Sequence, residues 1–213
     1  MTVDLLCLEA GAFAEAESKH REPSLFGVTD GKAVGTYLEQ KFQEDLHHRY
    51  VYEAGSSAKG IDFPELGVDL KVTSHKRPQS SCPYESARQK LYGLGYSLLV
   101  FVYDKTDDDE TRTARLNILH TIYVAAERTA DYQTTTGIRQ IVENSGNVDD
   151  LLGFFSERML PVEDIVATRL AEEVLANPPG IGYLTISNAL QWRLQYSRAI
   201  TEAGAVDGIV RVR

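Results

Sequence analysis

The run Tyr96-Ser-Leu-Leu-Val-Phe-Val-Tyr103 constrains the fold more than any other part of the chain. It is nearly all apolar and rich in residues that favour β-strands, so it lacks the polar positions of a strand with one solvated face. We therefore expect a central strand that is buried on both faces. The acidic stretch Asp107–Glu110 then reads as a solvated turn, and residues 116–124 as a further strand.

A second strand is expected upstream, where Gly60 to Ser74 reads Gly-Ile-Asp-Phe-Pro-Glu-Leu-Gly-Val-Asp-Leu-Lys-Val-Thr-Ser. Successive side chains of a strand point to opposite faces. One face then carries only the apolar residues Leu66, Val68, Leu70 and Val72. The other carries Gly67, Asp69, Lys71 and Thr73. A carboxylate and an ammonium group therefore lie side by side, and Asp62 lies one short turn upstream.

Hydrophobic periodicity and helix breakers predict the remaining elements. We expect irregular or weakly helical chain over 1–29, followed by a helix that Thr29 or Asp30 caps and that runs to about His48. Further along the chain we expect a short helix over 84–93, helical pieces over 137–158, and helices over 162–176 and 187–200, the last capped by Ser187. This order predicts an α/β fold with a mixed central β-sheet flanked by helices and a helical C-terminal part. With 213 residues, of which 43% are hydrophobic, the chain fits a single domain over 1–213, with its core at about 30–125 and the helical part at about 137–213.

Composition argues against several classes of protein. No run approaches the 18 apolar residues of a membrane-spanning helix, and acidic residues follow the N-terminal Met where a signal peptide carries basic ones. Cys7 and Cys82 make neither a disulfide framework nor a metal site, which fits a reduced, cytoplasmic protein. The net charge of −9 counts against nucleic-acid binding, although the stretch 71–90 is locally basic.

The pattern Asp62-x6-Asp69-x-Lys71 suits one kind of chemistry. Two carboxylates hold a hard cation such as Mg²⁺ through oxygen, and the lysine offsets charge on a phosphate. Glu65 competes with Asp69 as a ligand, but strand alternation does not bring it beside Lys71. The alternative interpretation is an ordinary solvated strand face, because acidic residues are common in this chain.

These residues resemble the active-site motif of the PD-(D/E)xK nuclease superfamily, which includes most Type II restriction endonucleases. The short spacer and the stretch 62–71 are most similar to the subgroup of the mismatch-repair endonuclease MutH. Upstream, Gly31–Glu39 resembles the helix that carries an accessory glutamate in that subgroup. The resemblance covers about 30–75 and, loosely, 96–103. Asp69 stands where glutamate is usual.

The resemblance implies a role for each residue of the motif. Asp62 and Asp69 bind the catalytic Mg²⁺, the carbonyl of Leu70 is a third ligand, and Lys71 positions the attacking water. Glu39 either reaches a second metal or Lys71, or is a solvated helix residue. The implied activity is a Mg²⁺-dependent, sequence-specific endonuclease for double-stranded DNA, most similar to a Type II restriction enzyme, that leaves a 5′-phosphate and a 3′-hydroxyl.

Two segments carry side chains that can contact phosphates or base edges. The first supplies Ser74, Lys76, Arg77, Gln79, Arg88 and Lys90, and the second, on the expected helix 187–200, supplies Asn188, Gln191, Arg193 and Gln195. The alternatives are a solvated loop and the polar outer face of an amphipathic helix.

Cleavage of both strands at a symmetric site calls for two active sites, so we expect a homodimer. A monomeric nicking or repair endonuclease and a non-catalytic DNA-binding domain with the same fold are the alternatives. All three residues of the motif are present, which favours the enzyme.

Overall fold

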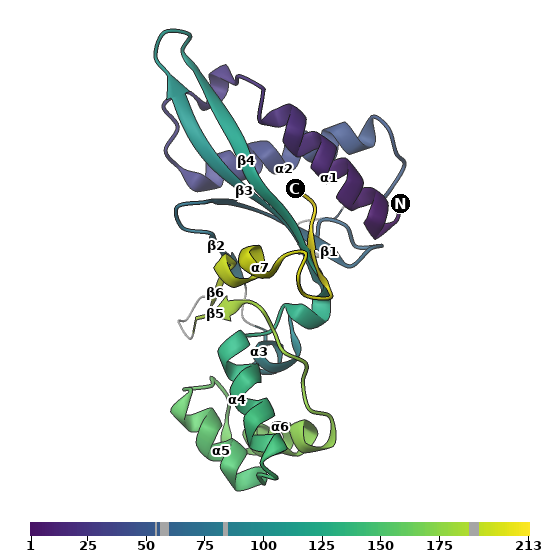
Figure 1. Ribbon diagram of the computed structural model, residues 1–213, viewed down its shortest axis with the longest axis vertical. Helices are drawn as coiled ribbons and strands as arrows, with labels where there is room; N and C mark the ends of the chain where they lie inside the picture. The colour runs from purple at the N-terminus through teal and green to yellow at the C-terminus, as the bar shows by residue number, and fades with distance from the viewer. Residues whose placement is uncertain (54, 56–59, 83–84, 188–191) are drawn as a thin grey trace. The chain divides into compact units, whose positions relative to one another are not determined.

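The computed structural model describes residues 1–53, 55, 60–82, 85–187 and 192–213, and contacts divide it into two compact units (Figure 1). The first unit holds Met1–Ser80, Ser97–Val124 and Ile200–Arg213, and the second holds Ser81–Tyr96 and Ala125–Ala199. The predicted α/β class, with a mixed central sheet and flanking helices, is confirmed. The single nuclease domain over 1–213 stays a prediction. Within the described ranges, no helix has the length and apolar character needed to cross a membrane.

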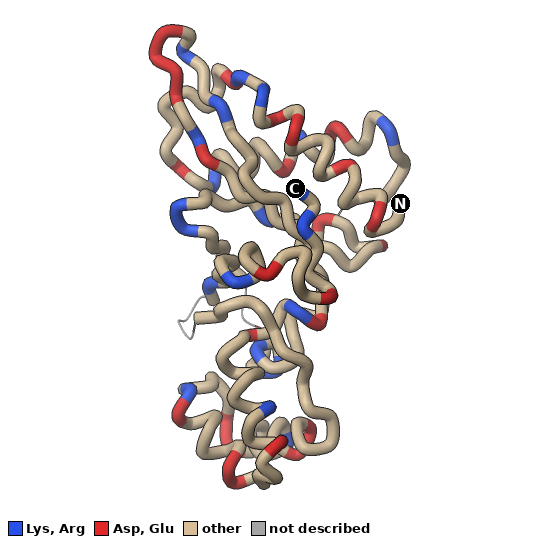
Figure 2. Tube along the Cα trace, in the orientation of Figure 1, with Lys and Arg blue, Asp and Glu red and all other residues tan. Residues whose placement is uncertain are grey.

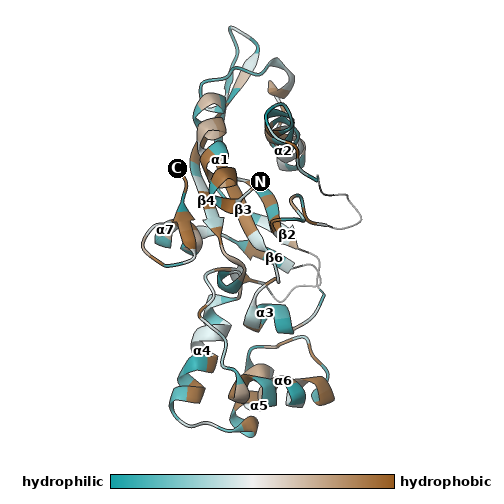
Figure 3. Cartoon of the chain, turned by 90° about the vertical axis from the view of Figure 1, so that its right-hand side faces the viewer, coloured by the Kyte–Doolittle hydropathy of each residue, from teal (hydrophilic) through white to brown (hydrophobic). Residues whose placement is uncertain are grey.

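The sheet of the first unit has the strand order β1-β3-β4-β7. Its strands are β1 (Val68–Ser74), β3 (Ser97–Asp108), β4 (Thr113–Val124) and β7 (Ile209–Arg211). β1 pairs in parallel with β3, and the other pairs are antiparallel. The strand predicted at 96–103 is confirmed as central and buried, because residues 98–102 are at most 1% exposed, and Figure 3 shows this stretch of β3 as hydrophobic. β1 lies at the edge of the sheet.

Helices α1 (Val3–Glu17) and α2 (Gly31–His47) cover one face of this sheet (Figure 1). Phe42 of α2 lies at the centre of their core, with its ring centroid 5.1 Å from Phe13 and 5.3 Å from Phe101. The predicted start of α2 is also confirmed, since Asp30 accepts a hydrogen bond from the Lys32 N–H at 3.0 Å. The apolar face predicted for β1 packs into this core.

α1 corrects the expectation of irregular or weakly helical chain over 1–29. Thr2 caps the helix by accepting a hydrogen bond from the Leu5 N–H at 3.2 Å. Leu6, Ala10 and Phe13 recur at helical spacing and are buried against the sheet. The signal was therefore present in the sequence. A short 3₁₀ helix, η1 (Pro23–Leu25), follows.

The second unit is mainly helical, which confirms the helices predicted between residues 84 and 176. Its helices are α3 (Arg88–Tyr92), η2 (Ala126–Arg128), α4 (Tyr132–Glu143), α5 (Val148–Glu157) and α6 (Asp164–Ala176). A small sheet has the order β2-β6-β5. Its strands are β6 (Trp192–Gln195) and β5 (Thr185–Ile186) of this unit and β2 (Gln79–Cys82), which begins in the first unit and ends in the second. The short helix α7 (Ser197–Glu202) follows β6.

The helix predicted over 187–200 is wrong at Trp192–Gln195, which form a strand, whereas Ser197 to Ile200 lie in α7 and residues 188–191 lie outside the described residues. Trp192, Leu194 and Tyr196 are at most 1% exposed, and the residues between them are exposed. This alternation has the period of a strand, so β6 forms where the helix was expected.

Candidate active site

A tight hairpin brings Asp62 to Asp69. Phe63 and Val68 form an antiparallel bridge with reciprocal backbone hydrogen bonds of 2.9 and 3.2 Å. Gly67 closes the turn with φ of +61°, a conformation that glycine adopts without steric cost. One position outward from the bridge, residue 62 lies opposite residue 69, and opposed side chains share a face. The hairpin therefore accounts for the spacing of six residues between the two aspartates.

The Asp62 carboxylate is held by two donors. Its Oδ2 accepts the Leu70 N–H at 2.9 Å, and its Oδ1 accepts the Gln43 Nε2–H at 3.1 Å. Because the Leu70 N–H points to Asp62, it points away from β3 and toward the free edge of the sheet. The N–H and C=O of one strand residue point to the same side. The Leu70 carbonyl therefore also faces the free edge.

Asp69 and Lys71 form an ion pair on the face of β1 opposite its apolar side chains. Lys71 Nζ lies 2.6 Å from Asp69 Oδ2, and Asp69 is only 3% exposed. Burial raises the pKa of Asp69; Lys71 opposes this rise and Asp62 adds to it. Asp69 therefore does not lie on the solvated strand face of the alternative interpretation.

Glu39 of α2 is half-buried near these residues. Burial, followed by the charge of Asp62, raises the pKa of Glu39 to about 7, and Asp69 adds to the rise while Lys71 opposes it. The charges of the four predicted residues thus influence one another. We call this group, formed by Asp62, Asp69, Lys71 and Glu39, the edge site. Glu65, the competing ligand candidate, is exposed, unlike the buried Asp69.

Sequence reasoning missed Gln43. It lies four residues after Glu39 on α2, so both side chains share a face of the helix. That spacing was the available signal.

The oxygen atoms of the edge site are suitable ligands for a magnesium ion. In the part of the chain that the structure describes, no group of three or more His, Cys, Asp or Glu side chains is arranged to hold a metal ion. Magnesium commonly takes only one or two carboxylates and keeps several waters. Asp62, Asp69 and the Leu70 carbonyl supply such oxygens, and the raised pKa of Asp69 reports negative charge that a cation would stabilise.

The DNA-contact candidates of the first unit are mostly accessible. Lys76, Arg77 and Gln79 are exposed, and Ser74 accepts the Lys76 N–H at 3.3 Å in the turn that follows β1. The buried hydroxyl of Thr73 accepts the Gln79 N–H at 2.9 Å and lies 3.2 Å from the Arg77 carbonyl. The Thr73 side chain therefore holds the loop after β1 in place through these two hydrogen bonds. The acidic run 107–110 lies apart, at the tip of the β3–β4 hairpin (Figure 2).

The candidates of the second unit are less uniform. Lys90 is 3% exposed, so it does not present its ammonium group at the surface, and Arg88 is paired with Glu173 at 2.6 Å. Arg193 and Gln195 are exposed on one side of β6 rather than on a helix. Asn188 and Gln191 lie outside the described residues.

Comparisons with known proteins match the full chain. A family model described as "Type II restriction enzyme NspV" matches residues 1–211. A protein of the same description from Nostoc sp. (strain ATCC 29411 / PCC 7524) is 63% identical over 212 residues, which cover 100% of this chain and 96% of that protein. No solved structure matches the chain. The similarity thus extends over both units.

Proposed function

This chain belongs to the Type II restriction enzyme NspV family, and we propose from this premise that it is a Mg²⁺-dependent endonuclease that cleaves double-stranded DNA at a specific sequence. Enzymes of this type generally need a divalent metal ion. The observation that carries the proposal is the buried Asp69–Lys71 pair opposite Asp62. Buried charge is costly unless function or pairing retains it, so this arrangement favours catalysis over a solvated strand.

Each residue of the edge site has a role in this proposal. Asp62, Asp69 and the carbonyl of Leu70 would hold Mg²⁺. When bound, this ion would lower the pKa of the attacking water and stabilise charge on the phosphate. The Lys71 ammonium orients the attacking water and offsets the charge that develops on the phosphate. Glu39, on α2, interacts electrostatically with the charged residues of the same site.

We also assign the site to the PD-(D/E)xK superfamily and its MutH-like subgroup. The hairpin of Phe63 and Val68 accounts for the short spacer that characterises the subgroup, and Glu39 comes from a helix ahead of the motif. Products with a 5′-phosphate and a 3′-hydroxyl follow from this assignment.

The DNA contacts that we retain are Ser74, Lys76, Arg77, Gln79, Arg193 and Gln195. Their donors can reach phosphates and base edges. The fixed loop after β1 begins at the strand that carries Asp69 and Lys71, which supports a direct link between binding and chemistry.

We propose that the enzyme acts as a homodimer, because two active sites are needed to cut both strands at a symmetric site. Light scattering with and without DNA measures the assembly, and a monomer in both conditions would contradict the dimer.

We also propose a reducing, cytoplasmic location, because Cys7 and Cys82 are both free cysteines.

Cleavage of mixed plasmid and phage DNA tests the proposed activity. Wild type with Mg²⁺ should give discrete fragments that EDTA abolishes and that DNA ligase rejoins, because ligation needs a 5′-phosphate. Lys71→Ala should give none. Lys32→Ala, an exposed lysine at the start of α2, is the matched control and should cleave like wild type.

Three results would overturn parts of the proposal. Equal cleavage by Lys71→Ala and wild type would remove the lysine from the chemistry. Cleavage that persists in EDTA would remove the metal. If neither methylated nor unmethylated DNA is cut with Mg²⁺ or Mn²⁺, the enzymatic function itself fails.

A further inference from the structure

The hydrogen bond from Gln43 to Asp62 joins α2 to the edge site. A carboxylate only accepts hydrogen bonds, so Gln43 must turn its amide nitrogen toward Asp62 Oδ1, and the distance is 3.1 Å. The other oxygen, Oδ2, accepts the Leu70 N–H. One donor on each oxygen fixes the plane of the carboxylate, and each oxygen keeps a further lone pair.

We propose that Gln43 is a positioning residue that orients Asp62 for Mg²⁺ binding. This inference rests on the proposed function of the edge site. Partners of metal ligands commonly hold the ligand in the geometry that the metal needs, and their loss typically weakens metal binding or activity by about 10- to 100-fold. In this proposal Gln43 acts through Asp62 and is not itself a metal ligand.

The backbone of Gln43 is itself held in place. Its neighbours on α2, Phe42 and Leu46, are fully buried in the core of the first unit. The Tyr52 hydroxyl donates to the Gln43 carbonyl at 3.2 Å, and the Tyr52 ring stacks on His47 with a centroid distance of 4.3 Å. The amide therefore comes from a rigid support, as a preorganised site requires.

The chemistry of an amide suits this position. Gln43 donates a hydrogen bond without carrying a charge, so it orients Asp62 and leaves the carboxylate fully negative for a cation. A lysine here would neutralise Asp62 and compete with the metal. A glutamate would add a further negative charge beside Asp62 and, when ionised, could not donate a hydrogen bond.

The experiment compares Gln43→Met with wild type and with Gln40→Met. Methionine keeps the length of the side chain and removes the donor, and Gln40 is an exposed glutamine on the same helix. The first readout is the rise in melting temperature when Mg²⁺ is added without DNA, from which the affinity follows by linkage. The second is the Mg²⁺ concentration that gives half-maximal cleavage.

We expect Gln43→Met to need about 10- to 100-fold more Mg²⁺ in both readouts, while Gln40→Met matches wild type. Saturating Mg²⁺ should restore most of the cleavage rate of Gln43→Met. An unchanged Mg²⁺ dependence would overturn the inference, and a lower melting temperature in EDTA with that unchanged dependence would leave Gln43 a structural role alone. If wild type itself neither cleaves nor responds to Mg²⁺, the proposed function fails and the inference fails with it.

Discussion

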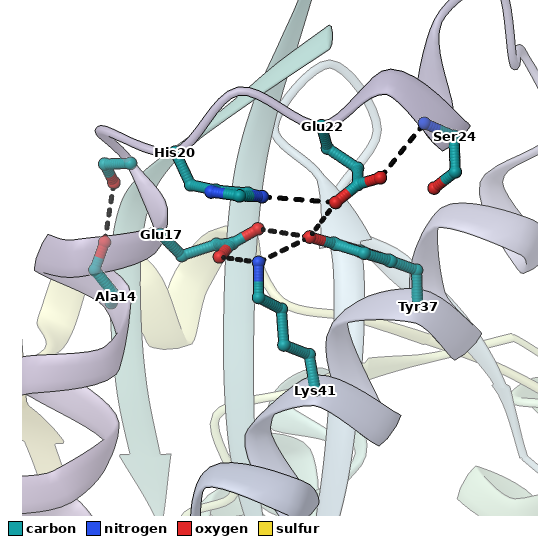
Figure 4. Close-up of polar contacts among 8 residues, drawn as sticks. Ala14, Glu17, His20, Glu22, Ser24, Tyr37 and Lys41 are labelled. Atoms are coloured by element: carbon teal, nitrogen blue, oxygen red, sulfur yellow. Dashed lines mark hydrogen bonds and ion pairs between the residues drawn. The ribbon is translucent and has the colours of Figure 1, made fainter. Parts of the chain in front are cut away.

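Helix α2 contributes to two polar clusters in the first unit, and the two clusters differ in what surrounds their carboxylates. Glu39 belongs to the edge site. Tyr37 and Lys41 belong to a second group, with Glu17 and Glu22, that we call the inter-helix cluster (Figure 4). Positions two residues apart lie about 200° apart around a helix. One helix therefore presents a lysine and a tyrosine on one side and a glutamate on the other.

The carboxylates of the inter-helix cluster are surrounded by donors. Lys41 Nζ lies 2.8 Å from Glu17, and the Tyr37 hydroxyl lies 3.0 Å from both glutamates. Glu22 also accepts the Ser24 N–H at 3.0 Å and contacts His20 at 3.1 Å. Burial opposes ionisation of Glu22, but these hydrogen bonds prevail and lower its pKa to about 2. The negative charge is stabilised here by the protein itself.

The edge site also combines carboxylates with a lysine, but its electrostatics are the opposite. Burial and neighbouring carboxylates raise the pKa values of Asp69 and Glu39 above those of ordinary carboxyl groups. The comparison teaches that carboxylates beside a lysine do not by themselves indicate a metal site. Charge that the protein leaves poorly stabilised is the better indicator, because a bound cation then gains the missing interaction.

The largest expected effect separates the two clusters by activity. Asp69→Asn should slow single-turnover cleavage at saturating Mg²⁺ by about 10³-fold, because it removes the proposed metal ligand and its charge. Glu17→Gln, the matched change of a buried carboxylate in the inter-helix cluster, should cleave at the wild-type rate. Cleavage by Asp69→Asn within tenfold of wild type would mean that Asp69, like Glu17, has only a structural role.

The next effect concerns stability, and we expect the change in the free energy of unfolding to have opposite signs in the two clusters. In EDTA at pH 8, Glu17→Gln should lower the free energy of unfolding by about 2 kcal/mol, because it removes the charged partner of Lys41. Asp69→Asn should raise the same free energy by about 1 kcal/mol, since the relief of a buried charge of raised pKa outweighs the loss of its ion pair with Lys71. Urea unfolding measures both, and a loss of stability in both variants would break the comparison.

The parts that could be predicted from the sequence are those whose pattern is local. The strand at 96–103 and α2 carry their periodicity within one element. The proximity of Asp62, Asp69 and Lys71 could be predicted because a single hairpin and one strand bring them together.

The parts that could not be predicted depend on distant packing. Nothing near Lys90 in the sequence indicates that its ammonium group is buried, and Gln43 meets Asp62 only because α2 packs beside β1. The strand at Trp192–Gln195 was missed because Asn188, Gln191 and Gln195 have the three- and four-residue spacing of a helix face, and the alternation within so short a strand is a weaker signal.

A smaller effect tests whether the inter-helix cluster is purely structural. Tyr37→Phe keeps the ring and removes the hydroxyl that lies between Glu17 and Glu22, so it should cost about 1.5 kcal/mol of stability. Cleavage and its Mg²⁺ dependence should remain those of wild type. Urea unfolding and the two cleavage measurements check this, and a change in Mg²⁺ dependence would show that the two sides of α2 are coupled.

The smallest effect is a dependence of stability on pH. The pKa of Glu39 is raised to about 7 in the folded protein, so the folded state keeps a proton that the unfolded chain loses at lower pH. Without metal, stability should therefore fall as the pH rises from about 4.5 to 7 and then level off. The half-buried position of Glu39 limits its share to about 1 kcal/mol.

Glu39→Gln should remove this share of the fall, and the exposed Glu44→Gln on the same helix should not. Urea unfolding in EDTA between pH 5 and pH 8 measures the difference between the two variants. Added Mg²⁺ should stabilise wild type more at pH 8 than at pH 6, because the ion competes with protons for the carboxylates. Parallel curves for wild type and Glu39→Gln would mean that Glu39 is as well stabilised as the carboxylates of the inter-helix cluster, and the contrast between the two sides of α2 would then rest on Asp69 alone.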